Sequence, residues 1–279
     1  MRTPPSTTVS SSSNAAASPS STSDSVSPCV SSTLMGADRP TRLKPETLRV
    51  SRRSSAEAAS ATAFAADKRE TRPVTPFTTI SLSAPVKLEL VQGDSESLSL
   101  EGEESALAEI ETVVEDGTLK IRTKPKMTFS WSNSKIRAKV SARSIEALKI
   151  SGSGDIAAAA LRAGALKLSI SGSGDIRIAT LSATNLDVSV SGSGDVTLGG
   201  KAESINSSIA GSGDLRAAKL EVREAKVSVA GSGDVTVWAT QSLAVRVAGS
   251  GDVKYYGDPA IQKNVAGSGS VRRMGNSPS

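Results

Sequence analysis

The sequence predicts an all-β protein built as a parallel β-helix, or β-solenoid, with about seven coils of 18–20 residues. Three observations lead to this fold class. A glycine-rich pentapeptide recurs seven times, segments of alternating polarity flank each copy, and aromatic residues make up only 3% of the 279-residue chain. A nearly fixed period is typical of repeat architectures, in which each unit buries its apolar face only by stacking on its neighbours.

The chain begins with a segment, residues 1–65, that we expect to be a disordered arm. Thirteen of its first 32 residues are serine, and large apolar side chains are almost absent. Such a composition buries too little surface to offset the conformational entropy of ordering. The Ala63-Phe64-Ala65 end resembles the end of a signal peptide, but Glu57 interrupts the stretch where an apolar region belongs. The segment is therefore either a plain arm or a degenerate or mis-started signal region.

Residues 70–143 follow as a small β unit that opens the domain. Val86, Leu88 and Leu90 alternate with polar residues, and this period of two indicates half-buried strands. Asp116-Gly117 predicts a hairpin between two further strands. The stretch from Glu103 to Glu111 is expected to form a short helical turn or a wide loop.

Residues 144–275 contain the repeats and decide the fold. Ser-Gly-Ser-Gly-Asp begins at residues 151, 171 and 191, Ala-Gly-Ser-Gly-Asp at 210, 230 and 248, and Ala-Gly-Ser-Gly-Ser at 266. The spacings between them are 20, 20, 19, 20, 18 and 18 residues. In the copy from Leu166 to Thr184, an alternating strand leads into the corner, a second strand leaves it, and a looser return closes the unit. The strands should stack in parallel, each paired with its equivalent one coil along.

The corner residues are expected to be structural. A corner that repeats in register needs positive φ at one or two positions, which glycine adopts most easily. The aspartate that follows can accept a backbone N–H in an Asx-type turn. Six aspartates should then form a ladder of like charges that is either solvated and hydrogen-bonded or partly neutralised by cations, calcium included. They are Asp155, Asp175, Asp195, Asp214, Asp234 and Asp252.

Composition excludes several classes of chemistry. The chain has no histidine and a single cysteine, Cys29, so histidine-based catalysis, an internal disulfide and a thiolate metal cluster are absent. The net charge of +5 belongs largely to residues 1–65, which carry +3 of it, so it is a weak signal for nucleic acid. No Lys-Ser/Thr follows the Gly-x-Gly corners, which excludes a P-loop. No stretch approaches 18 consecutive apolar residues, and no transmembrane segment is predicted.

A few aromatic residues lie near the ends of the repeat region. Trp238, Tyr255 and Tyr256 fall in the last coils, and Phe129 and Trp131 lie in a basic stretch before the first. An aromatic groove for a sugar or peptide is one interpretation. The other, which we favour, is that these side chains cover the open ends of the solenoid.

These corners resemble those of the family described as "putative auto-transporter adhesin, head GIN domain". The segments Phe77–Ile80, Val86–Leu90 and Gly117–Ile121 and the closing Gly267–Ser270 fit the same pattern, so the resemblance covers Phe77 to Arg273. It implies an all-β, β-helical domain exported to the bacterial envelope or surface. The family pattern supplies neither an activity nor catalytic residues.

The sequence as a whole predicts a non-catalytic, adhesin-like binding or structural module located in the periplasm or at the cell surface. We expect no catalytic, cofactor-binding or metal-binding residues and no cofactor. The candidate partners are a glycan, a cell-surface protein or another copy of the chain, and nucleic acid is not among them. The alternatives are a carbohydrate-active β-helix enzyme, which would need one cleft with convergent carboxylates, and a periplasmic scaffold.

Overall fold

The computed structural model describes residues 68–124 and 136–278, which belong to one compact unit within residues 60–279. The predicted arm, Cys29, Phe129 and Trp131 lie outside these residues. The N-terminal elements are β1 (Lys68–Arg72), β2 (Thr79–Ser83), β3 (Val86–Gln92), β4 (Ser97–Gly102), α1 (Glu104–Glu109), β5 (Ile110–Glu115), β6 (Thr118–Thr123) and β7 (Ile136–Ala142). The repeat region contributes β8 (Ala147–Gly152), β9 (Asp155–Gly172), β10 (Ile176–Gly192), β11 (Val196–Gly211), β12 (Leu215–Gly231), β13 (Val235–Gly249), β14 (Val253–Tyr256), β15 (Ala260–Gly267) and β16 (Val271–Gly275).

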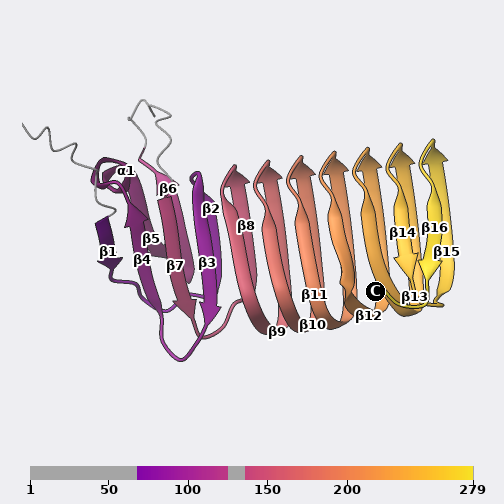
Figure 1. The fold of residues 1–279 in the computed structure, drawn as a ribbon, viewed down its shortest axis with the longest axis horizontal. Coiled ribbons are helices and arrows are strands. Elements are labelled where there is room, and N and C mark those ends of the chain that lie inside the picture. The colour runs from indigo at the N-terminus through magenta and orange to yellow at the C-terminus, as the bar shows by residue number, and fades with distance from the viewer. Residues whose placement is uncertain (1–67, 125–135, 279) are drawn as a thin grey trace, which may run out of the picture. The chain divides into compact units, whose positions relative to one another are not determined.

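The repeat region forms the predicted parallel solenoid (Figure 1). Strands β9 to β13 each run through most of one coil and pair in parallel with the equivalent strand of the next. The first glycine of every corner lies beside the first glycine of the following corner, from Gly152 to Gly267. The seven corners therefore bound about six complete turns, and the predicted fold class is confirmed.

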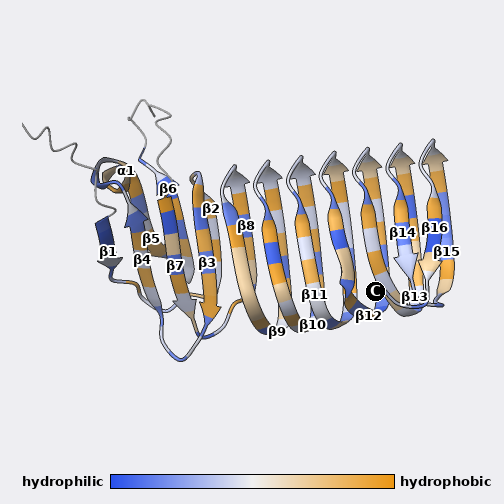
Figure 2. Ribbon diagram, in the orientation of Figure 1, coloured by the Kyte–Doolittle hydropathy of each residue, from blue (hydrophilic) through white to orange (hydrophobic). Residues whose placement is uncertain are grey.

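The core is a set of apolar columns that run along the stack. In β10, Ile176, Ile178, Leu181, Leu186 and Val188 are at most 2% exposed, and the residues between them point outward. Their register partners in the neighbouring coils are also apolar, apart from Ser207 beside Val188 and Gly200 beside Leu181, and regular hydrophobic bands follow the strands in Figure 2. Small and β-branched side chains suit this arrangement because the same position must pack on itself every coil.

The return segment of each coil is more regular than we predicted. The segment from Leu181 to Ala183 continues the strand and pairs in register with Leu161 to Ala163. Two consecutive exposed residues on either side of it, at positions 179–180 and 184–185, break the alternation and mark the bends. The prediction of a looser return was wrong because the bends need only these short interruptions, so the segment between them keeps its inter-coil hydrogen bonds.

The opening unit belongs to the same stack, in an order that differs from the chain order. Strand β2 pairs in parallel with both β6 and β8, and β3 pairs in parallel with both β7 and β9. The β2–β3 segment therefore lies between β6–β7 and the first repeat. Its corner is the Ser83-Ala84-Pro85 sequence, and an added Cβ on Gly154 of the next corner would meet the carbonyl of Ala84.

Antiparallel elements close the N-terminal end. Strands β1 and β4 add to β7 in antiparallel fashion, and β5 and β6 form the predicted hairpin, with φ of 50° at Asp116 and 67° at Gly117. The short helix α1 forms within the Glu103–Glu111 stretch and buries Leu107. Arg72 of β1 donates to the carbonyl oxygens of Ile110 and Leu107 at 2.6 and 3.0 Å, which ties the edge strand to this helix.

The last layer on the C-terminal side has charged residues, and no aromatic residues, at two of its core positions. Tyr255 continues an inward column next to Val237, but β16 pairs with β14 and so lies beyond it. In this last layer Lys263 takes the register position of the buried Val245, and Arg273 takes that of Tyr255. The prediction of an aromatic cap was therefore wrong for this end. Charge at core positions of an edge strand opposes the addition of another strand.

Ser207 is a polar residue at an otherwise apolar core position. It is 1% exposed, and its hydroxyl has no hydrogen-bond partner among the described residues, whereas its register partners Val188 and Val227 are aliphatic. A buried hydroxyl without a partner costs about 1–3 kcal/mol. We expect Ser207→Val to raise the free energy of unfolding by about 1–2 kcal/mol, measured by urea denaturation. Ser208→Val, at the exposed neighbouring position, is the control, and an equal gain there would contradict the explanation.

Candidate binding faces of the solenoid

Each corner combines two glycines that are required for different reasons. The first glycine has positive φ, as at Gly211 with 130° and Gly231 with 138°, where an L side chain is strained. The second glycine has no such φ, but a Cβ at Gly213 would overlap the carbonyl oxygen of Gly194 and lie 2.8 Å from Cγ1 of Val190. From the second corner onward the corners thus stack backbone on backbone, which leaves no room for a side chain at either position.

The six aspartates lie in one column, as predicted, and their hydrogen bonds run between coils. Oδ1 of Asp195 accepts from the backbone N–H of Asp214 at 3.1 Å, and Oδ1 of Asp214 accepts from that of Asp234 at 2.9 Å. The same bond joins Asp175 to Asp195, Asp234 to Asp252, and Asp252 to Ser270. The prediction of a carboxylate acceptor was correct, but the donor is one coil away and not within the same turn. In-register parallel stacking brings the next N–H within reach of each carboxylate.

Cations from the protein itself neutralise part of this ladder. The residue two positions after each aspartate points outward, and it is basic in alternate coils: Arg177, Arg216 and Lys254. Arg216 bridges Asp195 and Asp214 at 2.8 and 2.9 Å, and Arg177 contacts Asp175 at 2.6 Å. The hydrogen bond to Asp195 raises the pKa of Arg216. This neutralisation was not predicted, although the Asp-x-Arg and Asp-x-Lys spacing signals it.

The last rung of the ladder makes stability depend on pH. The Ser270 hydroxyl, with its backbone N–H, donates to Asp252 and holds the pKa of that carboxyl below its ordinary value. A carboxyl whose folded-state pKa is lowered stabilises the fold above its unfolded pKa, and this contribution is lost as the pH falls through the folded pKa. The pKa of Glu111, lowered mainly by the hydrogen bond from Arg122, acts in the same direction.

We therefore expect the melting temperature to be constant from pH 7 to about pH 5 and to fall below about pH 4. Ser270→Ala should make the difference between the melting temperatures at pH 7 and pH 3 smaller, because the folded pKa of Asp252 moves back towards its ordinary value. Ser268→Ala, at an exposed corner position of the same coil, is the control. An unchanged acid dependence in Ser270→Ala would contradict this assignment.

The described residues hold no group of three or more His, Cys, Asp or Glu side chains that could bind a metal ion. In the ladder, each Oδ1 from Asp175 to Asp252 already accepts a backbone N–H. Within the same residues, no helix is long and apolar enough to cross a membrane.

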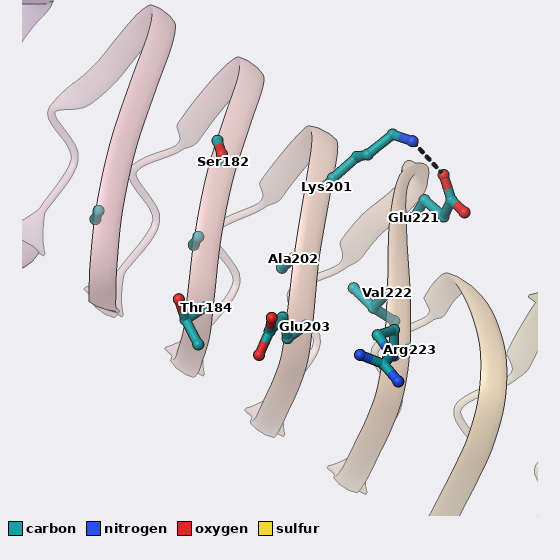
Figure 3. A pocket seen from close by; sticks show the side chains of 10 residues that line it. Ser182, Thr184, Lys201, Ala202, Glu203, Glu221, Val222 and Arg223 are labelled. Carbon is teal, nitrogen blue, oxygen red and sulfur yellow. Dashed lines mark ion pairs between the residues drawn. The ribbon is translucent and has the colours of Figure 1, made fainter.

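A groove runs along the return segments (Figure 3). Its volume is about 450 Å³, and its floor includes Ala163, Ala183 and Ala202. Lys201 and Glu221 form an ion pair of 3.1 Å on one side, and Glu203 and Arg223 lie on the other. The groove is open to solvent, and the carboxylate of Glu221 is engaged by a lysine. This arrangement suits contact with an extended polar partner more than a convergent pair of catalytic carboxylates.

A second groove lies where β3 meets the first repeats. It has a volume of about 600 Å³, and the small side chains Ala157, Ala159 and Ala179 line it. Lys87 and Arg177 are among its polar lining residues. Both grooves exist because alanine occupies consecutive positions of one column, so they extend along the stack and do not close into a pocket.

The segment before each corner presents a flat polar surface, which we name the serine face. It consists of the outward residues of β8 to β13: Lys149 and Ser151; Lys167, Ser169 and Ser171; Asp187, Ser189 and Ser191; Asn206, Ser208 and Ala210; Lys226, Ser228 and Ala230; and Ala244, Arg246 and Ala248. A hollow of about 380 Å³ opens on it between Asn206, Lys226, Ser228, Ala244 and Arg246. The sequence had assigned the first residue of each corner to the turn, and it did not single out the other residues of this face.

Comparison with known families decides the classification of this fold. A family model described as "Putative auto-transporter adhesin, head GIN domain" matches residues 76–259, which include all six aspartate corners. The chain belongs to this family. The GIN domain thus covers both the opening unit and most of the repeats, as the resemblance in the sequence implied. A comparison with curated proteins finds no match.

Solved structures share the GIN domain fold. A putative adhesin from Bacteroides fragilis is 25% identical with a TM-score of 0.71, and the match covers 75% of this chain and 97% of that one. A putative lipid binding protein from Parabacteroides distasonis is 26% identical with a TM-score of 0.63 and the same coverage. A putative adhesin from Parabacteroides merdae, at 21% identity, a TM-score of 0.59 and coverage of 75% and 96%, supports the fold alone.

Proposed function

We propose that this GIN domain is a non-catalytic, adhesin-like binding module of the bacterial envelope or cell surface, and that it holds an extended partner along the faces of its solenoid. The observation that carries the proposal is the form of its surface hollows. The described hollows on the three faces of the repeats are open, are lined by residues from consecutive coils, and follow the stacking direction. An enzyme needs a place where a few groups converge on one bond, whereas a partner with repeating chemistry is matched by repeating contacts.

The rigidity of the stack supports the same function. Every coil is joined to the next by strand pairing, and from Asp175 to Ser270 also by the aspartate bonds of the ladder, so the outward side chains are held at a regular spacing of about 4.8 Å. A surface that is ordered before binding loses little conformational entropy when a partner binds. Adhesin is also the word that describes the family and the similar structure from Bacteroides fragilis, and it supports a role outside the cytoplasm.

Exposure of the native protein on cells tests this proposal. The full chain would carry a C-terminal tag, and intact cells would be treated with an external protease. Loss of the tag from intact cells is the expected result and agrees with a surface-exposed module. Loss only after the outer membrane is opened would replace the adhesin-like role with that of a periplasmic scaffold, and protection in both conditions would overturn export altogether.

A test for turnover separates the binding module from a carbohydrate-active enzyme. The purified chain would be incubated with neutral and acidic polysaccharides, and release of reducing ends would be measured. We expect the chain to release no more reducing ends than the Glu203→Gln/Glu221→Gln variant, which lacks both carboxylates of the return groove. Turnover that this variant abolishes would show that the return groove is catalytic and would overturn the proposal.

A further inference from the structure

The serine face carries four basic side chains, one on each of β8, β9, β12 and β13. Lys149, Lys167, Lys226 and Arg246 are all exposed, and none forms an ion pair with another described residue. Arg177, Arg216 and Lys254 beside the aspartate ladder, in contrast, form ion pairs with its carboxylates. The carboxylate among the serine-face residues is Asp187, which accepts from Nδ2 of Asn206 at 3.1 Å.

The strand register groups these four cations into two pairs. Lys167 lies beside Ala147, two residues from Lys149, and Lys226 lies beside Ala244, two residues from Arg246. Each pair therefore occupies a diagonal on neighbouring coils. Lys167, Asp187, Asn206 and Lys226 are successive register partners, so three strand spacings, about 14 Å, separate the two pairs.

The second pair borders the hollow on this face. Because Ala244 is small, the space between Lys226 and Arg246 is open, and the Ser228 hydroxyl also lines it. An ammonium, a guanidinium and a hydroxyl provide donors to one small volume. A guanidinium binds carboxylate and sulfate oxygens with two parallel hydrogen bonds, so the chemistry of this hollow selects an anionic group.

The surface between the pairs is suited to a polyhydroxylated chain. Ser169, Ser189, Ser208 and Ser228 are successive register partners, and each hydroxyl can both donate and accept. The outward residues of the serine face include no aromatic side chain on which a nucleic-acid base could stack and no large apolar side chain that could enter a membrane.

We propose that the serine face binds an extended acidic polysaccharide, with its carboxylate or sulfate groups at the two cation pairs and its hydroxyl groups along the serine row. This inference rests on the proposed binding function and names its ligand class. Each contact is exposed and weak, and binding strength comes from several contacts made at once along one chain.

The experiment measures binding of the full chain to immobilised polygalacturonate and dextran sulfate, with uncharged dextran as the neutral comparison. The test variant is Lys226→Glu/Arg246→Glu. The matched control is Arg162→Glu/Lys219→Glu, which changes the net charge equally at two exposed residues of other segments that also lack an ion pair with a described residue. Melting temperatures confirm that both variants are folded.

We expect the acidic polymers to bind and dextran not to bind. The test variant should lose about tenfold or more in affinity, which corresponds to about 1.4 kcal/mol, while the control changes by less than about threefold. Binding should also weaken between 50 and 300 mM salt, because exposed charges are screened.

Three results would overturn the inference. An equal loss in the control would mean that net charge alone attracts the polymers, and equal binding of dextran would mean that the acid groups are not recognised. Binding to anionic phospholipid vesicles but to none of the polysaccharides would assign the face to a membrane. The surface role is tested separately by protease treatment of intact cells. If that treatment removes the tag, the surface role stands whichever of these three results is obtained, so the two proposals can fail independently.

Discussion

Gly211→Ala is expected to destabilise the domain by about 4 kcal/mol, one of the largest effects of a single substitution in this protein. The φ of 130° at Gly211 strains any L side chain by about 1–3 kcal/mol. The new Cβ would also overlap the carbonyl oxygen of Gly192 and lie 3.1 Å from its backbone nitrogen. The neighbouring atoms belong to the backbone of the preceding coil, so rotation of a side chain cannot relieve the overlap.

Gly164→Ala provides a matched control for this substitution. Gly164 lies in the same solenoid, but a Cβ added there meets nothing within 4 Å and its φ lies outside the positive range. This variant should be neutral or more stable by up to about 1 kcal/mol, because alanine reduces the entropy of the unfolded chain. Urea denaturation of the two variants measures the difference. A loss of less than about 1 kcal/mol in Gly211→Ala would show that the coils do not stack as closely as described.

Lys263→Val is expected to cause the domain to self-associate through its C-terminal end. Lys263 occupies the register position of the buried Val245, so valine would complete an apolar column on the last strand. Ile261 and Val265, which continue the neighbouring columns, are already 37% and 38% exposed. Together they would form an apolar edge with unpaired backbone groups, which is a template for strand addition.

Sedimentation velocity over a range of concentrations measures this effect. The variant should form species larger than those of the parent protein, increasingly so at micromolar concentrations and above. Gln262→Val is the control, because it adds the same side chain on the outward side of the same strand, in register with Ala244. Association of both variants to the same extent would mean that exposed apolar area alone is responsible, and that Lys263 has no particular role at the edge.

The regular part of the fold could be predicted because it depends on local patterns. Alternation around each corner assigns Val188 and Val190 to the core, since successive residues of a strand point to opposite sides. The constant spacing of the corners implies that they stack, and the Gly-x-Gly pattern identifies residues without room for a Cβ. The predicted hairpin at Asp116-Gly117 is confirmed for the same reason, because residues that accept positive φ are few.

The candidate site was less predictable, because the ladder and the serine face form only when coils are placed side by side. Asp214 and the N–H of Asp234 are 20 residues apart, and nothing in either pentapeptide shows that one accepts from the other. Likewise, Lys226 and Arg246 border one hollow only because the register partner of Lys226 is the small residue Ala244, which lies two residues from Arg246 in β13.

The sequence by itself determined that this protein is a β-solenoid, which residues face inward, and where each coil turns, because these properties depend on residues within one period of the chain. Only the tertiary structure decided the order of stacking, in which β2–β3 lies between β6–β7 and the first repeat. It also decided which strands cover the two ends of the stack. Parallel pairing joins strands far apart in the sequence, and several orders would satisfy the same alternation. The contacts between coils select one of them and, with it, the surfaces that the protein presents.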